Sequence, residues 1–452
     1  RFAPSPTGHL HIGGVRTALF NYVFARKMKG DFILRVEDTD LLRSKKEYVD
    51  SILASIEWLG FSLDEEPYFQ SSRLDIYRKY AQELIDAGKA YYCICTKEDI
   101  KREKEEAQKA GRSFAYSGRC RGNKKYDESA AIRLCKPDAK QYFIQDMIRG
   151  EVSVNSVEFD DFIIMKSDGT PTYSFACVVD DDLLGITHVI RGEDHITNTF
   201  KQLIIYELFG WSPPEFAHIP LINGPDGKRL SKRHGATALI EYKKMGFLRE
   251  PLLNYLSLLG WSPKNNEEIF DMEYLIANFD FAMVSKNPAQ FRIEKLTWMN
   301  GEYLFNMDIK KKTEILLSFI KEFKGFEPDK DLLLTIVSNL GDRGKTLEEI
   351  WEKIDFFFIF DGEYPKAKAF ESAALLYEVL EKCEFSTDSL EIAIKEFCEV
   401  NGVKLRKAAE HLRLGVSGKK VTPGLFETLF ILGKDETLKR LSEYEIWLKR
   451  SL

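Results

Sequence analysis

Apolar residues recur at helical spacing over residues 13–28. Because positions three to four residues apart lie on one face of an α-helix, this spacing predicts a helix there. A short apolar run over 32–36 predicts a strand, and two further helices are predicted over 45–59 and 74–87. A loop, a helix, a strand and a helix in this order are typical of a βαβ-type layer with a parallel sheet. The stripe of the first helix comprises Val15, Leu19, Tyr22, Val23 and Met28.

The pattern changes between residues 91 and 160. Short strands are predicted over 130–134 and 159–165, together with one heavily charged helix over 98–109. We interpret this stretch as an insertion into the first domain. The α/β pattern resumes over 172–179 and 186–191 and is followed by a predicted helix over 197–209.

Beyond residue 235 nearly every segment has helical periodicity. We find no internal repeat and no low-complexity tract. The chain is therefore predicted to be an α/β head that carries an insertion and is followed by a helical tail. The tail helices are predicted over 252–259, 310–323, 329–340, 373–380, 389–398, 425–432 and 436–448.

Length and composition add limits to this picture. A chain of 452 residues exceeds one compact core, which predicts two to four domains, and its net charge of −6 neither requires nor excludes nucleic acid. No apolar run approaches the roughly 20 residues that span a bilayer, and no signal peptide is visible. The seven cysteines are scattered, which indicates a reducing, cytoplasmic setting. Because the chain begins at Arg1 without a methionine, we expect a few residues to precede it.

The N-terminal segment combines two histidines with a glycine-rich turn that leads into the first helix. Backbone N–H groups and the positive end of the helix dipole suit a phosphate at such a place. His9 and His11 alternate around Leu10, so we expect neither to be buried with the apolar side chains. An imidazole beside a phosphate can donate a hydrogen bond to developing charge. The alternative is a surface loop with two solvated histidines.

A second candidate is the cationic segment after residue 227. The string 222–227 (Ile-Asn-Gly-Pro-Asp-Gly) is a strong turn signal, and four cations follow it. Such a loop can close over an anion. Lys232 is our main candidate for contact with a triphosphate, supported by Arg229 and Lys228. The alternative is an ordinary exposed basic loop.

These two strings resemble the HIGH and KMSKS signatures of class I aminoacyl-tRNA synthetases. They read His11-Ile12-Gly13-Gly14 and Arg229-Leu230-Ser231-Lys232-Arg233 here. Gly14 replaces an imidazole that many relatives use, so the resemblance leaves that role to His9 and His11. Four further strings, in the same order along the chain, resemble the glutamyl-tRNA synthetase family. They span residues 1–8, 33–40, 168–173 and 189–195.

The resemblance implies a reaction. The family activates L-glutamate with ATP to a glutamyl-adenylate and then transfers the glutamyl group to the 3′ end of tRNA(Glu). It implies Mg²⁺ carried on ATP, and we take a monomer as the default oligomeric state. The first step is an in-line displacement, in which positioning and charge stabilisation do most of the catalysis. The implied catalytic residues are His9, His11 and Lys232, and the implied ATP-binding residues are Gly13, Glu193, Asp194, Arg229, Ser231 and Lys232.

The resemblance also implies a glutamate pocket. Arg1 and Arg191 would meet the side-chain carboxylate, since a guanidinium fork suits a carboxylate. Glu37 would pair with the ammonium group, and Cys177 stands where relatives often have asparagine. Alternatively, Arg191 forms a surface salt bridge and Glu37 belongs to a solvated turn or a cation site. The implied pocket comprises Arg1, Ala3, Ser5, Glu37, Tyr173, Cys177 and Arg191.

Three cysteines of the insertion suggest a metal site. Cys93 and Cys95 form a C-x-C pair, and Cys120 follows Tyr116 at a spacing of four. Some relatives have a structural zinc knuckle with this pattern, which implies one Zn²⁺ held by these four residues. Cys135 is a reserve ligand. The alternative is a set of free thiols in a small β-rich insertion.

The tail resembles the all-helical anticodon-binding region of bacterial relatives. Arg413, Thr422 and Pro423 would lie near the anticodon, in a stretch that is basic within an acidic chain. The implied fold class is α/β, a Rossmann-type parallel-sheet catalytic head with a mixed α/β insertion and a helical C-terminal region. The implied domains are a catalytic domain (1–75 and 170–225), an inserted acceptor-stem-binding domain (76–169), a stem-contact domain with the KMSKS-like loop (226–307) and the anticodon-binding region (308–452).

Three other protein types share parts of this pattern. A truncated relative that glutamylates a modified tRNA base has the head but lacks the helical tail. Glutaminyl-tRNA synthetase also has the head, but its tail consists of β-barrels. A catalytically inactive tRNA-binding scaffold needs neither phosphate-facing signature, and this chain has both.

Overall fold

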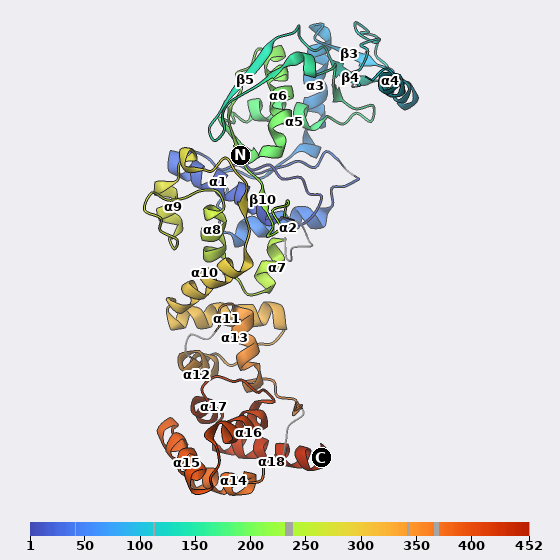
Figure 1. Ribbon diagram of the computed structural model, residues 1–452. Helices are drawn as coiled ribbons and strands as arrows, with labels where there is room; N and C mark the ends of the chain where they lie inside the picture. The colour runs from blue at the N-terminus through green and yellow to red at the C-terminus, as the bar shows by residue number, and fades with distance from the viewer. Residues whose placement is uncertain (41, 112–113, 231–237, 341–343, 366–369, 452) are drawn as a thin grey trace. The chain divides into compact units, whose positions relative to one another are not determined.

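The computed structural model describes residues 1–40, 42–111, 114–230, 238–340, 344–365 and 370–451. The chain forms two compact units (Figure 1). Unit 1 comprises Arg1–Glu241 and Leu252–Arg292, and unit 2 comprises Tyr242–Pro251 and Ile293–Leu452. The division into four domains at 75, 169, 225 and 307 is finer than this and stays a prediction.

Unit 1 contains the expected first helix, α1 (Ile12–Met28). Val15, Leu19 and Val23 are fully buried along it. Met28 is 60% exposed, so its place in the apolar stripe was wrongly predicted. It is the last residue of the helix, and residues 27–31 are all exposed, so this end of the helix extends past the core.

Unit 1 contains three parallel strand pairs among the described residues. The predicted strand over 32–36 is shorter than expected, because β1 covers only Arg35–Val36, although Leu34 also bridges Phe2 in parallel. Residues 173–179 belong to a helix, α5 (Tyr173–Leu183), with Thr172 as its N-cap, and the strand follows it. The pairs are β1 with β2 (Tyr68–Phe69), β8 (His188–Gly192) with β9 (Glu215–Ile219), and β10 (Ile222–Asn223) with β11 (Ala289–Gln290). The predicted helices are confirmed as α2 (Lys46–Trp58), α3 (Leu74–Asp86) and α6 (Ile196–Phe209).

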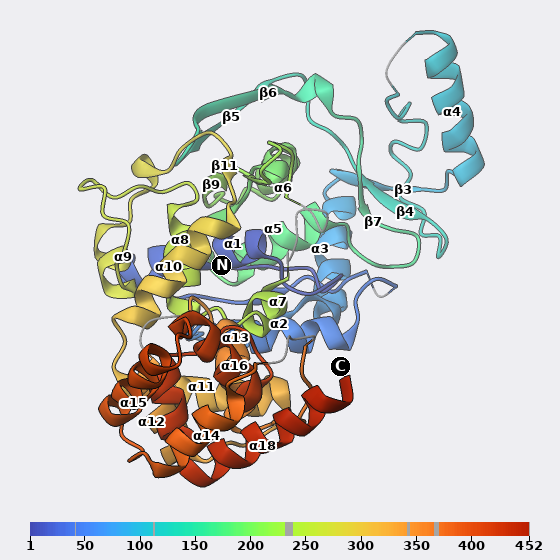
Figure 2. The ribbon, with the colours of Figure 1, turned by 60° about the horizontal axis from the view of Figure 1, so that its bottom comes forward.

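The insertion adds an antiparallel sheet in the order β3 (Ala90–Cys93), β4 (Ala131–Leu134), β7 (Ile163–Met165). The charged helix α4 (Lys97–Lys109) starts at a capping box of Thr96 and Asp99 and lies at the periphery in Figures 1 and 2. A hairpin of β5 (Gln141–Asp146) and β6 (Gly150–Asn155) was not predicted. Tyr142, Ile144 and Asp146 are the buried positions of β5. Because the third of these is a carboxylate rather than an apolar residue, the sequence lacks the apolar alternation that identifies a strand.

One apolar core joins the insertion to the parallel layer. It contains Tyr77 of α3, Leu134 of β4, Ile164 of β7, Phe175 of α5 and Ile204 of α6, each at most 1% exposed. The insertion therefore has no separate large core among the described residues, and it is fixed against the helices that carry residues 173–209.

Unit 2 is helical, as predicted. Helices α7 (Leu239–Lys244) and α8 (Arg249–Leu258) cross the boundary between the units, and α9 (Met272–Asn278) belongs to unit 1. Three helices of unit 2 were not among those predicted, namely α10 (Ile293–Phe305), α13 (Leu347–Ile354) and α16 (Leu405–Ser417). No helix in the described ranges is long and apolar enough to cross a membrane. Unit 2 contains α10 (Ile293–Phe305), α11 (Ile309–Lys324), α12 (Lys330–Leu340), α13 (Leu347–Ile354), α14 (Ala373–Lys382), α15 (Thr387–Val400), α16 (Leu405–Ser417), α17 (Leu425–Leu432) and α18 (Lys434–Ser451).

Candidate active site

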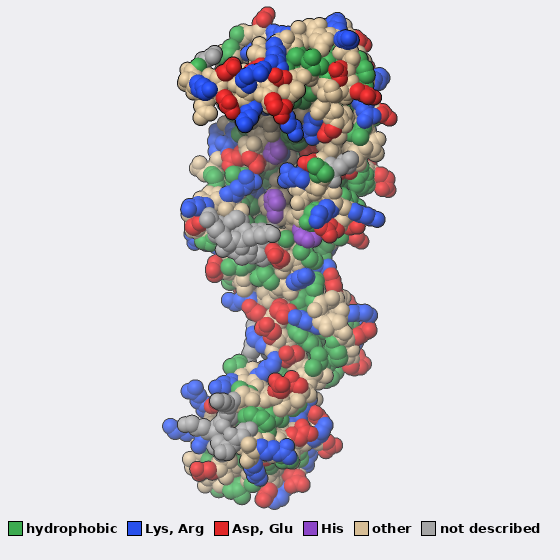
Figure 3. Space-filling model, turned by 90° about the vertical axis from the view of Figure 1, so that its right-hand side faces the viewer, with side chains coloured by type: hydrophobic (Ala, Val, Ile, Leu, Met, Phe, Trp, Pro, Cys, Tyr) green, Lys and Arg blue, Asp and Glu red, His purple; other side chains and the backbone are tan. Residues whose placement is uncertain are grey.

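A cavity of about 750 Å³ opens in unit 1, between the N-terminal segment and the end of β8. We call it the central cavity. Figure 3 shows a hollow in the upper part of the molecule with histidine side chains (purple) beside it. The sequence-predicted residues that line the cavity are Arg1, Ala3, Ser5, His9, His11, Gly13, Glu37, Tyr173, Arg191, Asp194 and Arg229. Residues implied separately for ATP and for glutamate thus share one cavity.

Arg191, on β8, is only 5% exposed and its guanidinium is held by neutral groups. Its Nη1 donates to the Tyr173 hydroxyl at 3.1 Å. Its Nη2 donates to Thr199 Oγ1 and to Gln202 Oε1, each at 2.7 Å. Its Nε donates to His218 Nε2 at 3.3 Å. Within the described part of the chain, no carboxylate pairs with this buried cation.

An unpaired buried cation is costly unless an anion joins it. Arg191 lines the central cavity, and its neighbours fix its orientation without neutralising its charge. The surface salt bridge considered as the alternative for Arg191 is therefore wrong. The cavity favours a ligand that brings a carboxylate or phosphate to this guanidinium.

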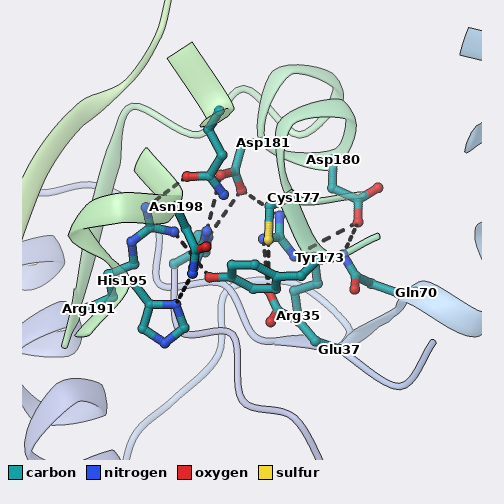
Figure 4. A network of polar contacts seen from close by, with 12 residues as sticks. Arg35, Glu37, Gln70, Tyr173, Cys177, Asp180, Asp181, Arg191, His195 and Asn198 are labelled. Atoms are coloured by element: carbon teal, nitrogen blue, oxygen red, sulfur yellow. Dashed lines mark hydrogen bonds and ion pairs between the residues drawn. The ribbon is translucent and has the colours of Figure 1, made fainter. Parts of the chain in front are cut away.

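Two other buried arginines, one in the cavity wall and one behind it, pair with carboxylates (Figure 4), whereas Arg16, which is buried and also lines the cavity, donates to the carbonyl oxygens of Leu259 and Pro220. Arg1 Nε and Nη2 donate to the two carboxylate oxygens of Asp181, each at 3.1 Å. Arg35 also donates to Asp181 and lies 3.3 Å from Glu37 Oε1. Burial alone would raise the pKa of Asp181, but the charges of Arg1 and Arg35 hold it well below its usual range. Sequence reasoning missed Asp181 and Arg35, although three aspartates after the apolar run 175–179 were a signal for buried pairing.

Glu37 is 8% exposed and lines the cavity, so it is not part of a solvated turn. Cys177 lies behind it, fully buried on α5, and its thiol donates to Glu37 Oε1 at 3.1 Å. The resemblance placed Cys177 in the implied pocket, but Cys177 does not line the cavity. Burial and the charge of Glu37 raise the pKa of this thiol, so it stays protonated and serves as the donor.

The N-terminal turn has the expected relation to the first helix. His9 and His11 are not buried and Leu10 is, as predicted. His11 is the N-cap of α1, and its Nδ1 accepts a hydrogen bond from Gly14 N at 3.1 Å. Desolvation and the charge of Arg229 lower the pKa of His11, so the ring is neutral near pH 7. Its proton then resides on Nε2, which is available as a donor.

The cationic segment contributes one predicted cation to the cavity within the described ranges. Arg229 Nη2 lies 3.2 Å from Asp194 Oδ2, and both side chains are more than one-third exposed. The predicted turn before it is present, with a left-handed Gly227 at φ 75°. Glu193 does not line the cavity, because its Oε1 accepts from Leu221 N at 2.8 Å and its other oxygen contacts Arg149. Ser231 and Lys232 lie outside the described residues.

The three predicted sulfur ligands of the insertion come together. The Sγ atoms of Cys93, Cys95 and Cys120 lie within 4.8 Å of one another. The Tyr116 hydroxyl lies 3.5 Å from Cys93 Sγ and 3.2 Å from Cys95 Sγ. Tetrahedral Zn–S bonds of about 2.3 Å place sulfurs about 3.8 Å apart, so this donor set fits zinc. Cys135 packs against the same cluster but is not one of the three converging thiols.

The predicted anticodon residues are neighbours in unit 2. Arg413 Nε, on α16, donates to Thr422 Oγ1 at 3.2 Å, and Thr422 in turn donates to Pro423 O at 3.0 Å. Thr422 and Pro423 are buried, whereas Val421 beside them is 73% exposed. Thr422 and Pro423 therefore shape this turn and hold Arg413 rather than presenting a large exposed surface.

Comparisons with known proteins agree with the geometry. Residues 1–298 match the catalytic domain of class I tRNA synthetases (E and Q), and residues 312–444 match an anticodon binding domain. The chain is 43% identical to glutamate–tRNA ligase 2 of Thermoanaerobacter pseudethanolicus, over 98% of this chain and 97% of that protein. It is 44% identical to glutamate–tRNA ligase of Thermodesulfovibrio yellowstonii, over 98% of both chains.

A solved structure is similar over the same length. A glutamate–tRNA ligase from Elizabethkingia meningosepticum, in complex with its amino acid, has a TM-score of 0.83 at 34% identity and covers 99% of each chain. With its α/β head, helical tail and cation-lined cavity, this chain belongs to the class I tRNA synthetases of the glutamate and glutamine group and matches glutamate–tRNA ligases over nearly all of their length.

Proposed function

We propose that this protein ligates L-glutamate to the 3′ end of tRNA(Glu) through a glutamyl-adenylate, releasing AMP and diphosphate. The observation that carries the proposal is the guanidinium of Arg191, which is buried at the cavity wall and surrounded by neutral partners. An anionic side chain satisfies it, whereas an amide leaves its charge uncompensated. This favours glutamate over glutamine as the substrate.

In this proposal the substrate lies along the wall from Arg191 to Glu37. Arg191 and Arg1 receive the side-chain carboxylate, and Tyr173 closes that end. Glu37 pairs with the ammonium group, held in place by Arg35 at 3.3 Å and by the thiol of Cys177 at 3.1 Å. A cysteine thus keeps a donor on Glu37 at the position where asparagine is common. Ala3 and Ser5 form the remaining wall.

ATP then occupies the part of the cavity beside the first turn of α1. The backbone near Gly13 and the helix dipole favour its phosphates, and His9 and His11 donate to charge that develops on them. The phosphates would also be bound by residues of the cationic loop, namely Arg229, Ser231 and Lys232. The nucleoside would lie beside Asp194 and the segment at Leu221, whose N–H donates to Glu193. When bound with ATP, Mg²⁺ neutralises phosphate charge. The glutamate carboxylate attacks the α-phosphorus, an oxygen–phosphorus bond forms, and diphosphate leaves.

We further propose one structural Zn²⁺ on Cys93, Cys95, Cys120 and Tyr116. Burial alone would raise the pKa of Cys93, but hydrogen bonds from Tyr116 and other donors lower it, which favours the Cys93 thiolate. Burial raises the pKa of Cys95. Metal analysis of protein purified without chelator should give about one zinc per chain. Cys120→Ser should lose the metal and Cys383→Ser should keep it. Zinc-free wild-type protein would contradict this site.

Unit 2 would bind the anticodon arm, with Arg413 positioned for it by Thr422 and Pro423. We propose that the protein acts as a cytoplasmic monomer. Such a monomer meets tRNA, ATP and glutamate in the same compartment, and the proposed pocket needs no residue from a second chain.

Aminoacylation of purified tRNA(Glu) and tRNA(Gln) tests the proposal. We expect glutamate, ATP and tRNA(Glu) to give glutamyl-tRNA. The same reaction with glutamine in place of glutamate should give at least about 100-fold less product, because an amide does not neutralise the buried guanidinium of Arg191. Preferred charging of glutamine would favour the glutaminyl enzyme instead. Glutamate attached at a base rather than at the 3′ end would favour the base-modifying relative, and no product with either amino acid would favour the inactive scaffold.

A further inference from the structure

A buried imidazole links the insertion to the cavity. His218, on β9, is 0% exposed, and its Nε2 accepts from Arg191 Nε at 3.3 Å. Its Nδ1 lies 2.6 Å from Oδ2 of Asp146, which is 2% exposed. Asp146 ends β5, so the hairpin of the insertion supplies a carboxylate 72 residues away from the histidine it contacts.

The carboxylate sets which nitrogen of the ring carries the proton. An ionised carboxylate is an acceptor only, so Asp146 requires the proton on Nδ1 and leaves a lone pair on Nε2. Asp146 is itself fixed, because its Oδ1 accepts from Ile148 N at 3.0 Å and from Arg149 N at 2.9 Å. Burial alone would raise its pKa, but these bonds and the one from His218 lower it. Burial lowers the pKa of His218, which keeps the ring neutral.

The lone pair on Nε2 defines the plane of the Arg191 guanidinium. A guanidinium is planar, so acceptors at Nε and at Nη2 together fix its rotation. His218 supplies the first acceptor, and Thr199 and Gln202 supply the second. Nη1 then points toward the Tyr173 hydroxyl at the cavity wall. Thr199 Oγ1 also lies 3.0 Å from His218 Nε2, so the same nitrogen faces both Arg191 and its partner Thr199.

We propose that Asp146 and His218 are positioning residues that orient Arg191 toward the side-chain carboxylate of the substrate. This inference rests on the proposed function, since it assigns to Arg191 the substrate carboxylate. It adds that the β5–β6 hairpin, which lies within the segment 76–169 that the resemblance assigned to acceptor-stem binding, also shapes the amino-acid pocket. Neither residue lines the central cavity, and both act through Arg191, so their effect should appear in the use of glutamate and not in the use of ATP.

Three variants separate orientation from simple packing. His218→Asn keeps a donor toward Asp146 but has no acceptor that reaches Arg191. His218→Gln extends an amide oxygen toward Arg191 and gives up the donor to Asp146. Asp146→Asn keeps Oδ1 for the N–H groups of Ile148 and Arg149. The amide that replaces Oδ2 loses the bond from the backbone N–H of His218, donates to Nδ1 and shifts the ring proton to Nε2, where it opposes Arg191.

Steady-state aminoacylation with varied glutamate or ATP, together with thermal unfolding, is the measurement. His218→Asn and Asp146→Asn should raise KM for glutamate about 10-fold or more, the usual cost of a lost bond to a charged group, with kcat and KM for ATP within about 2-fold of wild type. His218→Gln should raise KM for glutamate by about 3-fold or less, because it restores the acceptor.

Two results would overturn the inference. One is a KM for glutamate in Asp146→Asn equal to that of wild type. The other is His218→Gln as impaired as His218→Asn at an equal unfolding temperature, which would indicate packing alone. Wild-type protein that does not charge glutamate would instead contradict the proposed function, so the two failures are distinguishable. If one His218 variant does not fold, Asp146→Asn still decides.

Discussion

Replacing Arg191 with leucine is expected to lower kcat/KM for glutamate by at least about 100-fold, in line with the roughly 2–5 kcal/mol typical of a lost buried charge contact. Arg191 is 5% exposed and its guanidinium has only neutral protein partners within the described ranges. Its positive charge is therefore available to neutralise an anionic ligand in the cavity. Glutamate activation by ATP–diphosphate exchange in the presence of tRNA measures the loss. The same variant should lose most of its preference for glutamate over glutamine.

The controls for Arg191 come from the same unit. Arg191→Lys keeps the charge but loses the planar fork, so we expect an intermediate loss. Arg26→Leu removes an arginine that pairs with Asp64 on the surface, where its side chain is 22% exposed, and should leave glutamate use within about 2-fold. An Arg191→Leu protein that charges glutamate as well as Arg26→Leu would exclude Arg191 from the pocket.

The members of this site that could be predicted from sequence are those within short motifs. Arg1, Glu37, Tyr173 and Arg191 each stand in a string that resembles the family, and all four line one cavity. Asp181 and His218 could not be predicted in this way. Their partners are set by packing between segments 180 and 27 residues apart, and no local period encodes that distance. Lone charged residues within apolar runs are the available signal for such buried pairs.

The fold shows the same division. Long helices such as α1 and α11 were predicted because three or more turns repeat one apolar face. Strands β2, β10 and β11 have two residues each, too few for any alternation to be visible. The insertion could be recognised from the sequence as a change in pattern. Its part in the pocket could not, because the insertion contacts α5 and α6 through a shared core of residues that are far apart in the sequence.

The two arginines of the proposed pocket, Arg191 and Arg1, differ in whether a protein carboxylate neutralises their charge. Arg191 retains its full charge for a ligand, whereas Arg1 shares Asp181 with Arg35 in a buried space that also holds Asp180. Arg35 in turn contacts Glu37, which links the two ends of the proposed substrate. Asp181 therefore holds the wall together, and its removal should affect folding more than it affects any single substrate contact.

Asp181→Asn is accordingly expected to destabilise unit 1 by about 3 kcal/mol, because it leaves the buried guanidinium of Arg1 without its carboxylate and takes from Arg35 the nearest of its three. Asp64→Asn, which weakens a surface pair with Arg26, should cost less than about 1 kcal/mol. The pKa of Asp181 is depressed in the folded protein, so its contribution is complete above the unfolded pKa of about 3.9 and is lost as the pH falls through the folded value. Urea unfolding should therefore show a constant gap between wild type and Asp181→Asn from about pH 8 to pH 5 and a shrinking gap below about pH 4. A gap no larger than that of Asp64→Asn at neutral pH would show that Arg1 and Arg35 do not depend on this carboxylate.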